Sequence, residues 1–185
     1  MSLIQKAKDH LQMALAQLEI AGRKDHQPKT AHHDRTTYQH MLDVAAVAEA
    51  SGAREEVVAA GIIHDNGKPT ALDLSNGENM FKHEALGAEG AEQHGFPALT
   101  VELIKLHGHR MNAEQVKPAQ AYKTVKEAAD RAGVSVAEFV SYMALLNDWD
   151  CSAFSPEGRE IGKKQMEVLV KKIEEGTPKE ASHGQ

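Results

Sequence analysis

The fold and the chemistry of this chain are decided by one stretch, AAGIIHDNGKP at residues 59–69. It opens with small apolar residues and then places an imidazole beside a carboxylate, at His64 and Asp65. It closes with Gly67, Lys68 and Pro69, which are signals for the end of a helix. Burying two polar side chains at the end of an apolar helix costs free energy unless they have a partner. The stretch therefore predicts a buried helix that ends in a functional site.

The composition favours an all-α protein. Apolar residues make up 41% of the 185 residues and charged residues 26%, which is ordinary for a globular protein with one full-sized core. Aromatic residues are only 4%, while alanine is abundant, so closely packed helices are favoured over a β-sandwich. We find no internal repeat and no stretch with the alternating pattern of a strand.

Charge and cysteine content exclude several classes of function. The net charge of −6 argues against a nucleic-acid binder and against a protein that binds anionic membranes, because both need basic surfaces. No apolar run is long enough to cross a bilayer. The one cysteine, Cys151, rules out a disulfide framework, so we expect a cytoplasmic protein. The sequence does not indicate an oligomeric state.

Apolar periodicity and capping signals predict a bundle of helices with three longer loops. The predicted helices cover residues 3–21, 38–50, 54–64, 83–94, 98–107, 120–132, 136–151 and 157–175. The predicted loops cover residues 23–35, 68–82 and 108–119. Thr36 or Thr37 is expected to cap the second helix, and Ser135 the seventh. We expect one domain over residues 1–185, with a core at about 36–154 and the first and last helices packed on it.

Six polar residues recur in one pattern: each lies at or near the end of a predicted helix and on its apolar face. They are His40, His64, Asp65, His83, His107 and Asp150. One buried histidine is usually satisfied by a hydrogen bond. Several inward imidazoles and carboxylates together would each bear a desolvation cost, which a divalent metal removes. The set therefore predicts a metal site.

Two positions in this set have neighbours that offer an alternative. Asp148 could replace Asp150, although the helical phase of Phe139, Met143 and Leu146 turns Asp150 inward. His109 could likewise replace His107, although the phase of Leu103 and Ile104 favours His107. The absence of a cysteine cluster argues against a structural zinc or iron–sulfur site. One or two ions of iron, manganese, cobalt, nickel or zinc suit these ligands, and with two ions Asp65 is expected to bridge them.

The order His40, His64–Asp65 followed by Gly67–Lys68, and Asp150 resembles the HD-domain superfamily of metal-dependent phosphohydrolases. His83 and His107 are similar to the additional histidines of its dinuclear members. The resemblance covers about residues 36–154. It implies an all-α, HD-domain-like bundle of five core helices, with extra N- and C-terminal helices in this chain. It also implies hydrolysis of a nucleotide or another small phosphate ester, with Asp65 and Lys68 as the catalytic residues.

The same ligand set is similar to that of a smaller branch of the fold, the diiron oxygenases that cleave a polyol or a hydroxyphosphonate. Lys68 favours the hydrolytic branch, because it could hold a phosphate and assist departure of the leaving group. A non-catalytic, metal-stabilised module is a third hypothesis. The candidates for substrate binding are five polar side chains near the expected site. They are Lys68, Tyr38, Arg35, Lys82 and Arg110.

Overall fold

The computed structural model describes residues 1–29 and 32–178, and within these ranges the chain contains helices and no strand. The expected all-α fold is therefore confirmed. In chain order the elements are α1 (Leu3–Ile20), α2 (Thr37–Ala50), α3 (Glu55–Ile63), α4 (Lys68–Leu74), α5 (His83–Gln93), α6 (Ala98–Leu106), the 3₁₀ helix η1 (His109–Asn112), α7 (Pro118–Ala132), α8 (Val136–Ser152) and α9 (Pro156–Gly176).

The predicted caps are present at the starts of the helices. The Thr36 hydroxyl accepts a hydrogen bond from the backbone N–H of Gln39 and so caps α2. Ser135 and Glu138 form a reciprocal capping box at the start of α8. These side chains satisfy backbone N–H groups that have no partner inside the helix, which explains why helix starts could be predicted within a few residues.

The expectation of a loop over residues 68–82 is wrong in its first half, where the chain forms α4. Pro69 occupies the first turn of this helix. A proline lacks the backbone N–H, but the first helical turn does not use that donor, so proline starts a helix as readily as it ends one. The predicted loop at 108–119 likewise contains η1, and α7 begins at Pro118.

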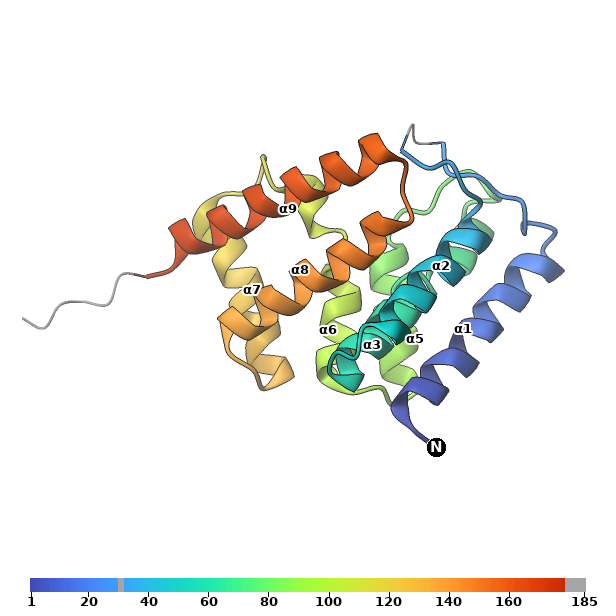
Figure 1. The fold of residues 1–185 in the computed structure, drawn as a ribbon, viewed down its shortest axis with the longest axis horizontal. Helices are drawn as coiled ribbons and strands as arrows, with labels where there is room; N and C mark the ends of the chain where they lie inside the picture. The colour runs from blue at the N-terminus through green and yellow to red at the C-terminus, as the bar shows by residue number, and fades with distance from the viewer. Residues whose placement is uncertain (30–31, 179–185) are drawn as a thin grey trace, which may run out of the picture.

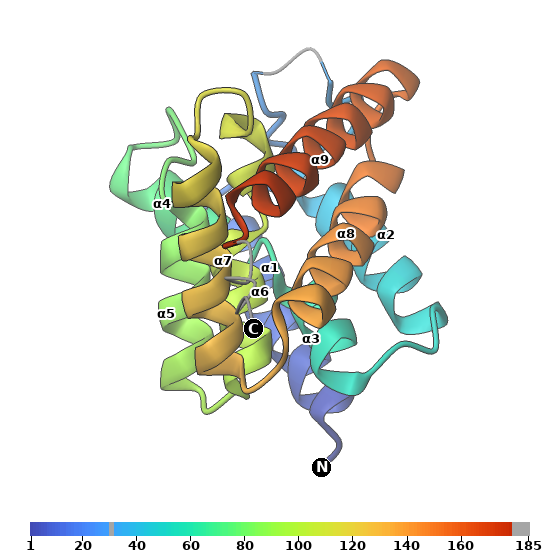
Figure 2. The same cartoon turned by 90° about the vertical axis from the view of Figure 1, so that its left-hand side faces the viewer.

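The helix α3 lies at the centre of the fold and packs against α1, α2, α6 and α8. Every residue from Val57 to Ile63 on this helix is buried. Buried side chains from α1 to α9 form one hydrophobic core. The helix α1 packs against α2, α3 and α4, and α9 lies across α7 and α8 (Figure 1). In the perpendicular view, α5, α6 and α7 are seen on the opposite side from α2 and α8 (Figure 2).

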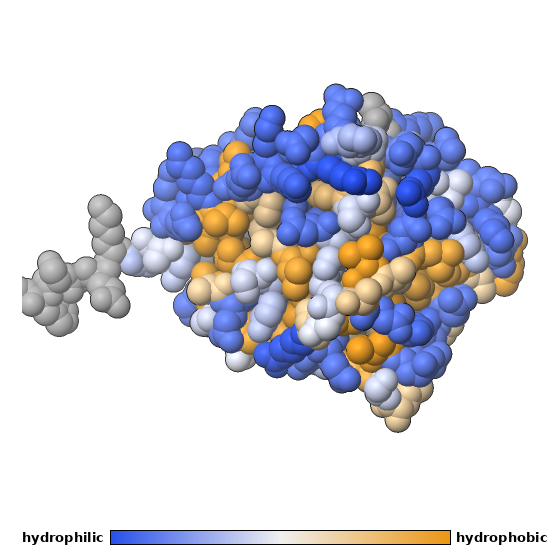
Figure 3. Space-filling view, viewed as in Figure 1, coloured by the Kyte–Doolittle hydropathy of each residue, from blue (hydrophilic) through white to orange (hydrophobic). Residues whose placement is uncertain are grey.

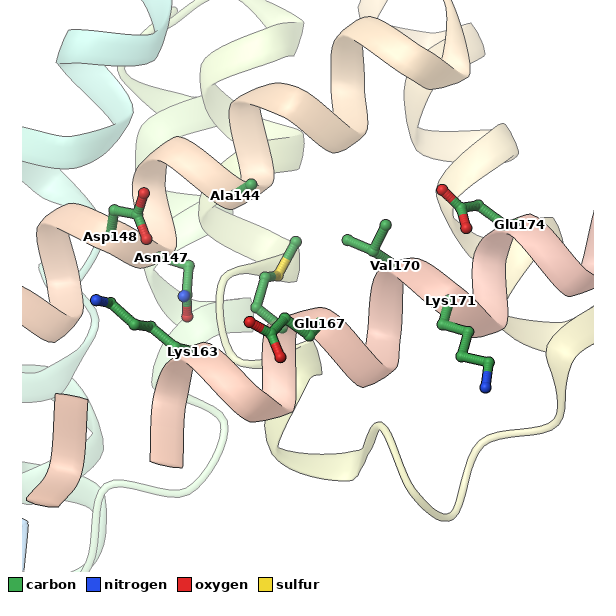
Figure 4. A pocket seen from close by; sticks show the side chains of 9 residues that line it. Ala144, Asn147, Asp148, Lys163, Glu167, Val170, Lys171 and Glu174 are labelled. Atoms are coloured by element: carbon green, nitrogen blue, oxygen red, sulfur yellow. The ribbon is translucent and has the colours of Figure 1, made fainter. Parts of the chain in front are cut away.

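The surface seen in Figure 3 is mostly polar, with apolar side chains in separate patches. No helix in the described part of the chain combines the length and the hydropathy that crossing a bilayer requires. A groove of about 430 Å³ runs between α8 and α9, where Asp148 and Lys163 lie at one end and Glu174 at the other (Figure 4).

Candidate metal centre

Helix ends bring the six candidate ligands together. His40 lies in the first turn of α2, and His83 is the first residue of α5. His64 and His107 are the residues that follow the last turns of α3 and α6, and Asp150 lies in the last turn of α8. These ends meet at one end of the bundle, so residues from five helices surround one small volume.

The ligand atoms form two groups that share Asp65. The first ligand group consists of His40, His64, Asp65 and Asp150. The second ligand group consists of Asp65, His83 and His107. Within each group the atoms lie within 4.8 Å of one another, a separation that one metal ion can span.

Asp65 directs one carboxylate oxygen to each group. Its Oδ2 atom lies 3.2 Å from Nε2 of both His40 and His64. Its Oδ1 atom lies 3.3 Å from Nε2 of His83 and 3.6 Å from Nε2 of His107. Asp150 completes the first ligand group, with Oδ1 3.0 Å from His40 Nε2 and 3.4 Å from His64 Nε2. Asp65 therefore has the position of a carboxylate that bridges two ions.

Backbone carbonyls orient three of the four imidazoles. The Nδ1 atoms of His64, His83 and His107 donate to the carbonyl oxygens of the residues three positions earlier, at 2.9, 2.9 and 2.6 Å. When Nδ1 carries the proton, the Nε2 lone pair points into the centre, which is the tautomer that binds a metal. The backbone of each helix end thus prepares the ring as a ligand.

The buried polar atoms of this centre fit a cation. The Nε2 atoms of His83 and His107 lie 3.2 Å apart, so two lone pairs face each other unless a positive charge lies between them. The His40 Nε2 and His64 Nε2 atoms are buried, and none of their close contacts among the described residues is aligned as a hydrogen bond. Such atoms are costly to bury without a partner, and divalent metals are the natural partner for this donor set.

The electrostatics of the centre favour positive charge. Burial alone would lower the pKa of His64, but the charges of Asp65 and Asp150 outweigh it and raise this pKa to about 10. Burial alone would raise the pKa values of the Asp65 and Asp150 carboxyls. The charges of His64 and Lys68 nevertheless hold the pKa of Asp65 well below its usual range. Arg110, together with His40 and His64, does the same for the pKa of Asp150. By contrast, burial and the nearby His83 lower the pKa of His107.

Two cations accompany the two carboxylates. Lys68 Nζ lies 2.6 Å from Asp65 Oδ2, and Arg110 Nη2 donates to Asp150 Oδ2 at 2.8 Å. Arg110 also donates to the carbonyl oxygen of His107 at 3.0 Å, so it connects the two ligand groups. Both side chains are buried, with only 6% of each residue exposed. The sequence had suggested both as substrate-binding residues, and they are the two of the five that reach the centre.

A cavity of about 140 Å³ opens beside the second ligand group. Its wall contains the ligands Asp65, His83, His107 and Asp150, the cations Lys68 and Arg110, and the other side chains Pro28, His33, Met80, Glu84, Met111 and Phe154. The groove between α8 and α9 shares no lining residue with this cavity.

Three of the predicted substrate-binding residues do not line the cavity. Arg35 is exposed and pairs with Asp43. The Lys24 ammonium lies over the ring of Tyr38, 4.7 Å from its centroid. Lys82 is exposed and has a positive φ of 64° just before α5. Charge and proximity in the sequence suggested all three, but neither property determines on which side of a helix or loop a side chain lies.

The structure also distinguishes between the alternative ligands, Asp148 or Asp150 and His109 or His107. Asp148 is exposed and lines the groove between α8 and α9, whereas Asp150 is buried in the first ligand group. His109 begins η1 and belongs to neither ligand group, whereas His107 belongs to the second. The roles of these residues as metal ligands remain predictions, now supported by the geometry.

Close backbone packing sets the position of His83 relative to Asp65. A Cβ atom added to Gly67 would overlap the carbonyl oxygen of His83 and lie 2.5 Å from the backbone nitrogen of Gly87. The turn after Asp65 and the first turn of α5 can therefore approach each other only because residue 67 has no side chain. Gly67 thus helps to bring the two ligand groups together.

Comparison with known proteins agrees with this arrangement. The sequence model of the HD domain family matches residues 37–148, more than half of the chain. The chain belongs to the HD domain family. Proteins of this family are metal-dependent enzymes, either hydrolases or oxygenases, and they bind divalent metals.

One curated relative of this HD-domain protein is a [1-hydroxy-2-(trimethylamino)ethyl]phosphonate dioxygenase (glycine-betaine-forming) from Leisingera caerulea. The two sequences are 33% identical over 76 residues, which cover 39% of this chain and 38% of the relative. The match thus spans well under half the length of the relative. It shows sequence similarity between the two proteins over part of this chain.

Proposed function

We propose that this chain is a phosphohydrolase that uses a dinuclear metal centre to hydrolyse a small phosphate ester. The observation that carries the proposal is that two buried cations, the second ligand group and the two carboxylates of the first line one cavity. Lys68 and Arg110 line the same cavity as Asp65, His83 and His107. Hydrolysis is the simplest reaction for such a cavity, because it needs no second substrate besides water.

The charge balance of the cavity supports a phosphorylated substrate. Lys68 and Arg110 neutralise Asp65 and Asp150 in their ion pairs. A divalent cation in each ligand group would leave the cavity with an excess of positive charge, even with Glu84 in its wall. A phosphate group restores the balance and accepts charge-assisted hydrogen bonds from both cations. The cavity size favours a small phosphate group over a polynucleotide backbone.

The chain's own residues would perform four tasks in this reaction. The backbone carbonyls hold the imidazoles of His64, His83 and His107 with Nε2 directed to the centre. Asp65 directs one carboxylate oxygen to each ligand group and so sets the distance between the two groups. Lys68 binds a phosphoryl oxygen, and Arg110 compensates the negative charge that develops on phosphorus–oxygen bonds. Divalent ions held by these residues supply Lewis-acid chemistry, which activates water and stabilises negative charge on a phosphoryl group.

A second candidate is oxidative cleavage of a hydroxyphosphonate or a similar polar substrate. Its specific support is the partial match to a phosphonate dioxygenase. Lys68 favoured hydrolysis on sequence grounds, but its ammonium group pairs with Asp65 and lies at the cavity in a position that would serve a phosphonate equally well. A phosphonate carries the same charge and the same oxygen geometry as a phosphate ester, so the cavity charge supports both candidates.

Parallel assays of the same protein separate the two reactions. The protein is loaded with Mn²⁺, Co²⁺ or Fe²⁺ and incubated with nucleotides, phosphomonoesters and phosphodiesters. Phosphate release is measured for the nucleotides and monoesters, and the monoester and alcohol products are measured for the diesters. Oxygen uptake by the Fe²⁺ form is measured with a panel of 1-hydroxyphosphonates and polyols. We expect phosphate release without oxygen uptake. The variant Asp65→Asn should abolish this phosphate release. Oxygen uptake that depends on a hydroxyphosphonate, with no ester hydrolysis, would replace the first candidate by the second.

A further inference from the structure

Two residues that precede α2, Pro28 and His33, form one side of the cavity wall. The carbonyl oxygen of His26 accepts a hydrogen bond from the backbone N–H of Thr37 at 2.8 Å, at the base of the segment. At its far side, the carbonyl oxygen of His32 accepts from the backbone N–H of Ser155 at 3.0 Å. Ser155 is the N-cap of α9. The junction between α8 and α9 therefore fixes the backbone directly before His33.

Tight packing reinforces this attachment. A Cβ atom added to Gly158, in the first turn of α9, would lie 2.8 Å from the Cβ of His32 and 3.1 Å from its carbonyl oxygen. Any side chain at residue 158 would thus displace His32. Because the distance between His32 and α9 is set by backbone and Cβ atoms, a rotamer change cannot relieve the overlap.

His33 directs its ring into the cavity wall. The ring centroid lies 4.6 Å from that of Phe154 and 5.2 Å from that of His40. His33 lines the cavity together with Lys68 and Arg110. Its Nδ1 atom is fully buried, so Nε2 is the ring nitrogen that remains accessible, and no side-chain hydrogen bond occupies it among the described residues. His33 belongs to neither ligand group.

We propose that His33 binds the phosphate or phosphonate group of the substrate and that the junction between α8 and α9 holds it in position. The inference rests on the proposed function for the charge of the substrate, and it assigns a further residue to that site. A phosphoryl oxygen in the cavity accepts a hydrogen bond from the accessible ring nitrogen of His33, beside those that it accepts from Lys68 and Arg110. His33 lies outside residues 37–148, the part of the chain that the family model matches.

Binding of inorganic phosphate to the fully metal-loaded protein tests the inference without a known substrate. The variant His33→Phe keeps an aromatic ring against Phe154 but removes the ring nitrogen. We expect its dissociation constant for phosphate, measured by calorimetry, to rise about tenfold, the effect of one hydrogen bond to a charged group. His33→Gln, which retains a polar donor, should recover part of the affinity. The metal content of both variants, measured by elemental analysis, should equal that of the wild type.

The role of the junction has its own matched pair of variants. Gly158→Ala should displace His32 and with it His33, and so weaken phosphate binding by a similar factor. Gly90→Ala is the control, because a Cβ atom there meets nothing within 4 Å, and it should bind phosphate as the wild type does. Thermal unfolding of both variants shows whether Gly158→Ala still folds; His33→Phe tests the binding role independently of that outcome.

Three results would overturn the inference in distinguishable ways. Wild-type affinity for phosphate in His33→Phe would show that the ring only packs against Phe154. A loss of metal in His33→Phe would make His33 a metal ligand instead. Failure of the metal-loaded wild type to bind phosphate would contradict the proposed function itself, and the inference would fail with it.

Discussion

All four side chains of the first ligand group are buried, whereas the second ligand group contains His83, whose side chain is 14% exposed in the cavity wall. The first group offers four protein ligands and the second only three. Metal sites that serve structure are usually closed by protein ligands, whereas catalytic sites keep a position for water or substrate. The comparison indicates that the first ion would be held firmly and that the substrate would meet the second.

Asp65 is the residue that both groups share, so its substitution should have the largest effect. In Asp65→Asn the bridging charge is lost, while Lys68 and the histidines keep their positions. We expect loss of both metals and of turnover, well beyond the roughly 10- to 100-fold cost of removing an outer partner of a metal ligand. Elemental analysis of protein purified with excess metal is the measurement. Retention of one full metal equivalent would show that the two groups are independent.

Substitution of one histidine in each group tests the comparison directly. His107→Ala removes a ligand from the open group, so we expect it to retain about one metal ion per chain and to lose most of its turnover. His40→Ala opens the closed group, where a buried first ion would no longer be held, so both ions should be lost or weakened. Metal titrations of the two variants measure this asymmetry. Equal losses in both variants would contradict the distinction between a closed and an open group.

Helix phase and helix ends are local properties, and they were enough to identify the candidate ligands. The stripe of Phe139, Met143 and Leu146 on α8 is buried, and the same phase turns Asp150 inward. His64 and His107 follow the last turns of their helices, where a backbone carbonyl orients the ring. Each of these features is encoded within about one or two helical turns, which is why the sequence could reveal them.

The wall of the cavity could not be predicted in the same way. Phe154 and Met111 reach it from different elements, and no spacing in the sequence relates them to His64. His33 falls in the predicted loop over residues 23–35, and its position depends on contacts of the preceding residue, His32, with Ser155 and Gly158, more than 100 residues away. The start of α4 was missed for a different reason, since the same Pro69 is compatible with the end and with the start of a helix.

The pH dependence of metal binding should also differ between the two groups. The pKa of His64 is raised from 6.5 to about 10, so in metal-free protein this ring is charged at pH 8, and its ion pairs with Asp65 and Asp150 stabilise the fold. This stabilisation is complete below pH 6.5 and is lost as the pH rises through about 10. The pKa of His107 is lowered, so its ring is neutral at pH 8.

A metal that enters the first ligand group must therefore displace a proton, whereas a metal that enters the second need not. We expect release of about one proton per ion in His107→Ala, which keeps the first group, and an affinity that rises about tenfold per pH unit between pH 7 and 9. In wild-type protein the ring of His107 should contribute little proton release when the second ion binds. Calorimetry in buffers of different ionisation enthalpy counts these protons. No proton release from His107→Ala would show that His64 is already neutral.

The smallest effect is expected outside both groups, at Asp148. This carboxylate is exposed in the groove between α8 and α9, where Figure 4 shows it near Lys163, while Asp150 two residues later is buried in the first ligand group. Two residues along a helix turn the side chain by more than half a circle, so only one of the two can face the centre.

Asp148→Asn should leave the metal content unchanged and shift the free energy of unfolding by less than about 0.5 kcal/mol. Asp150→Asn, measured beside it, should release the first ion. Loss of metal from Asp148→Asn but not from Asp150→Asn would mean that α8 presents its other face to the centre. The assignment of Asp150 to the closed group would then be wrong.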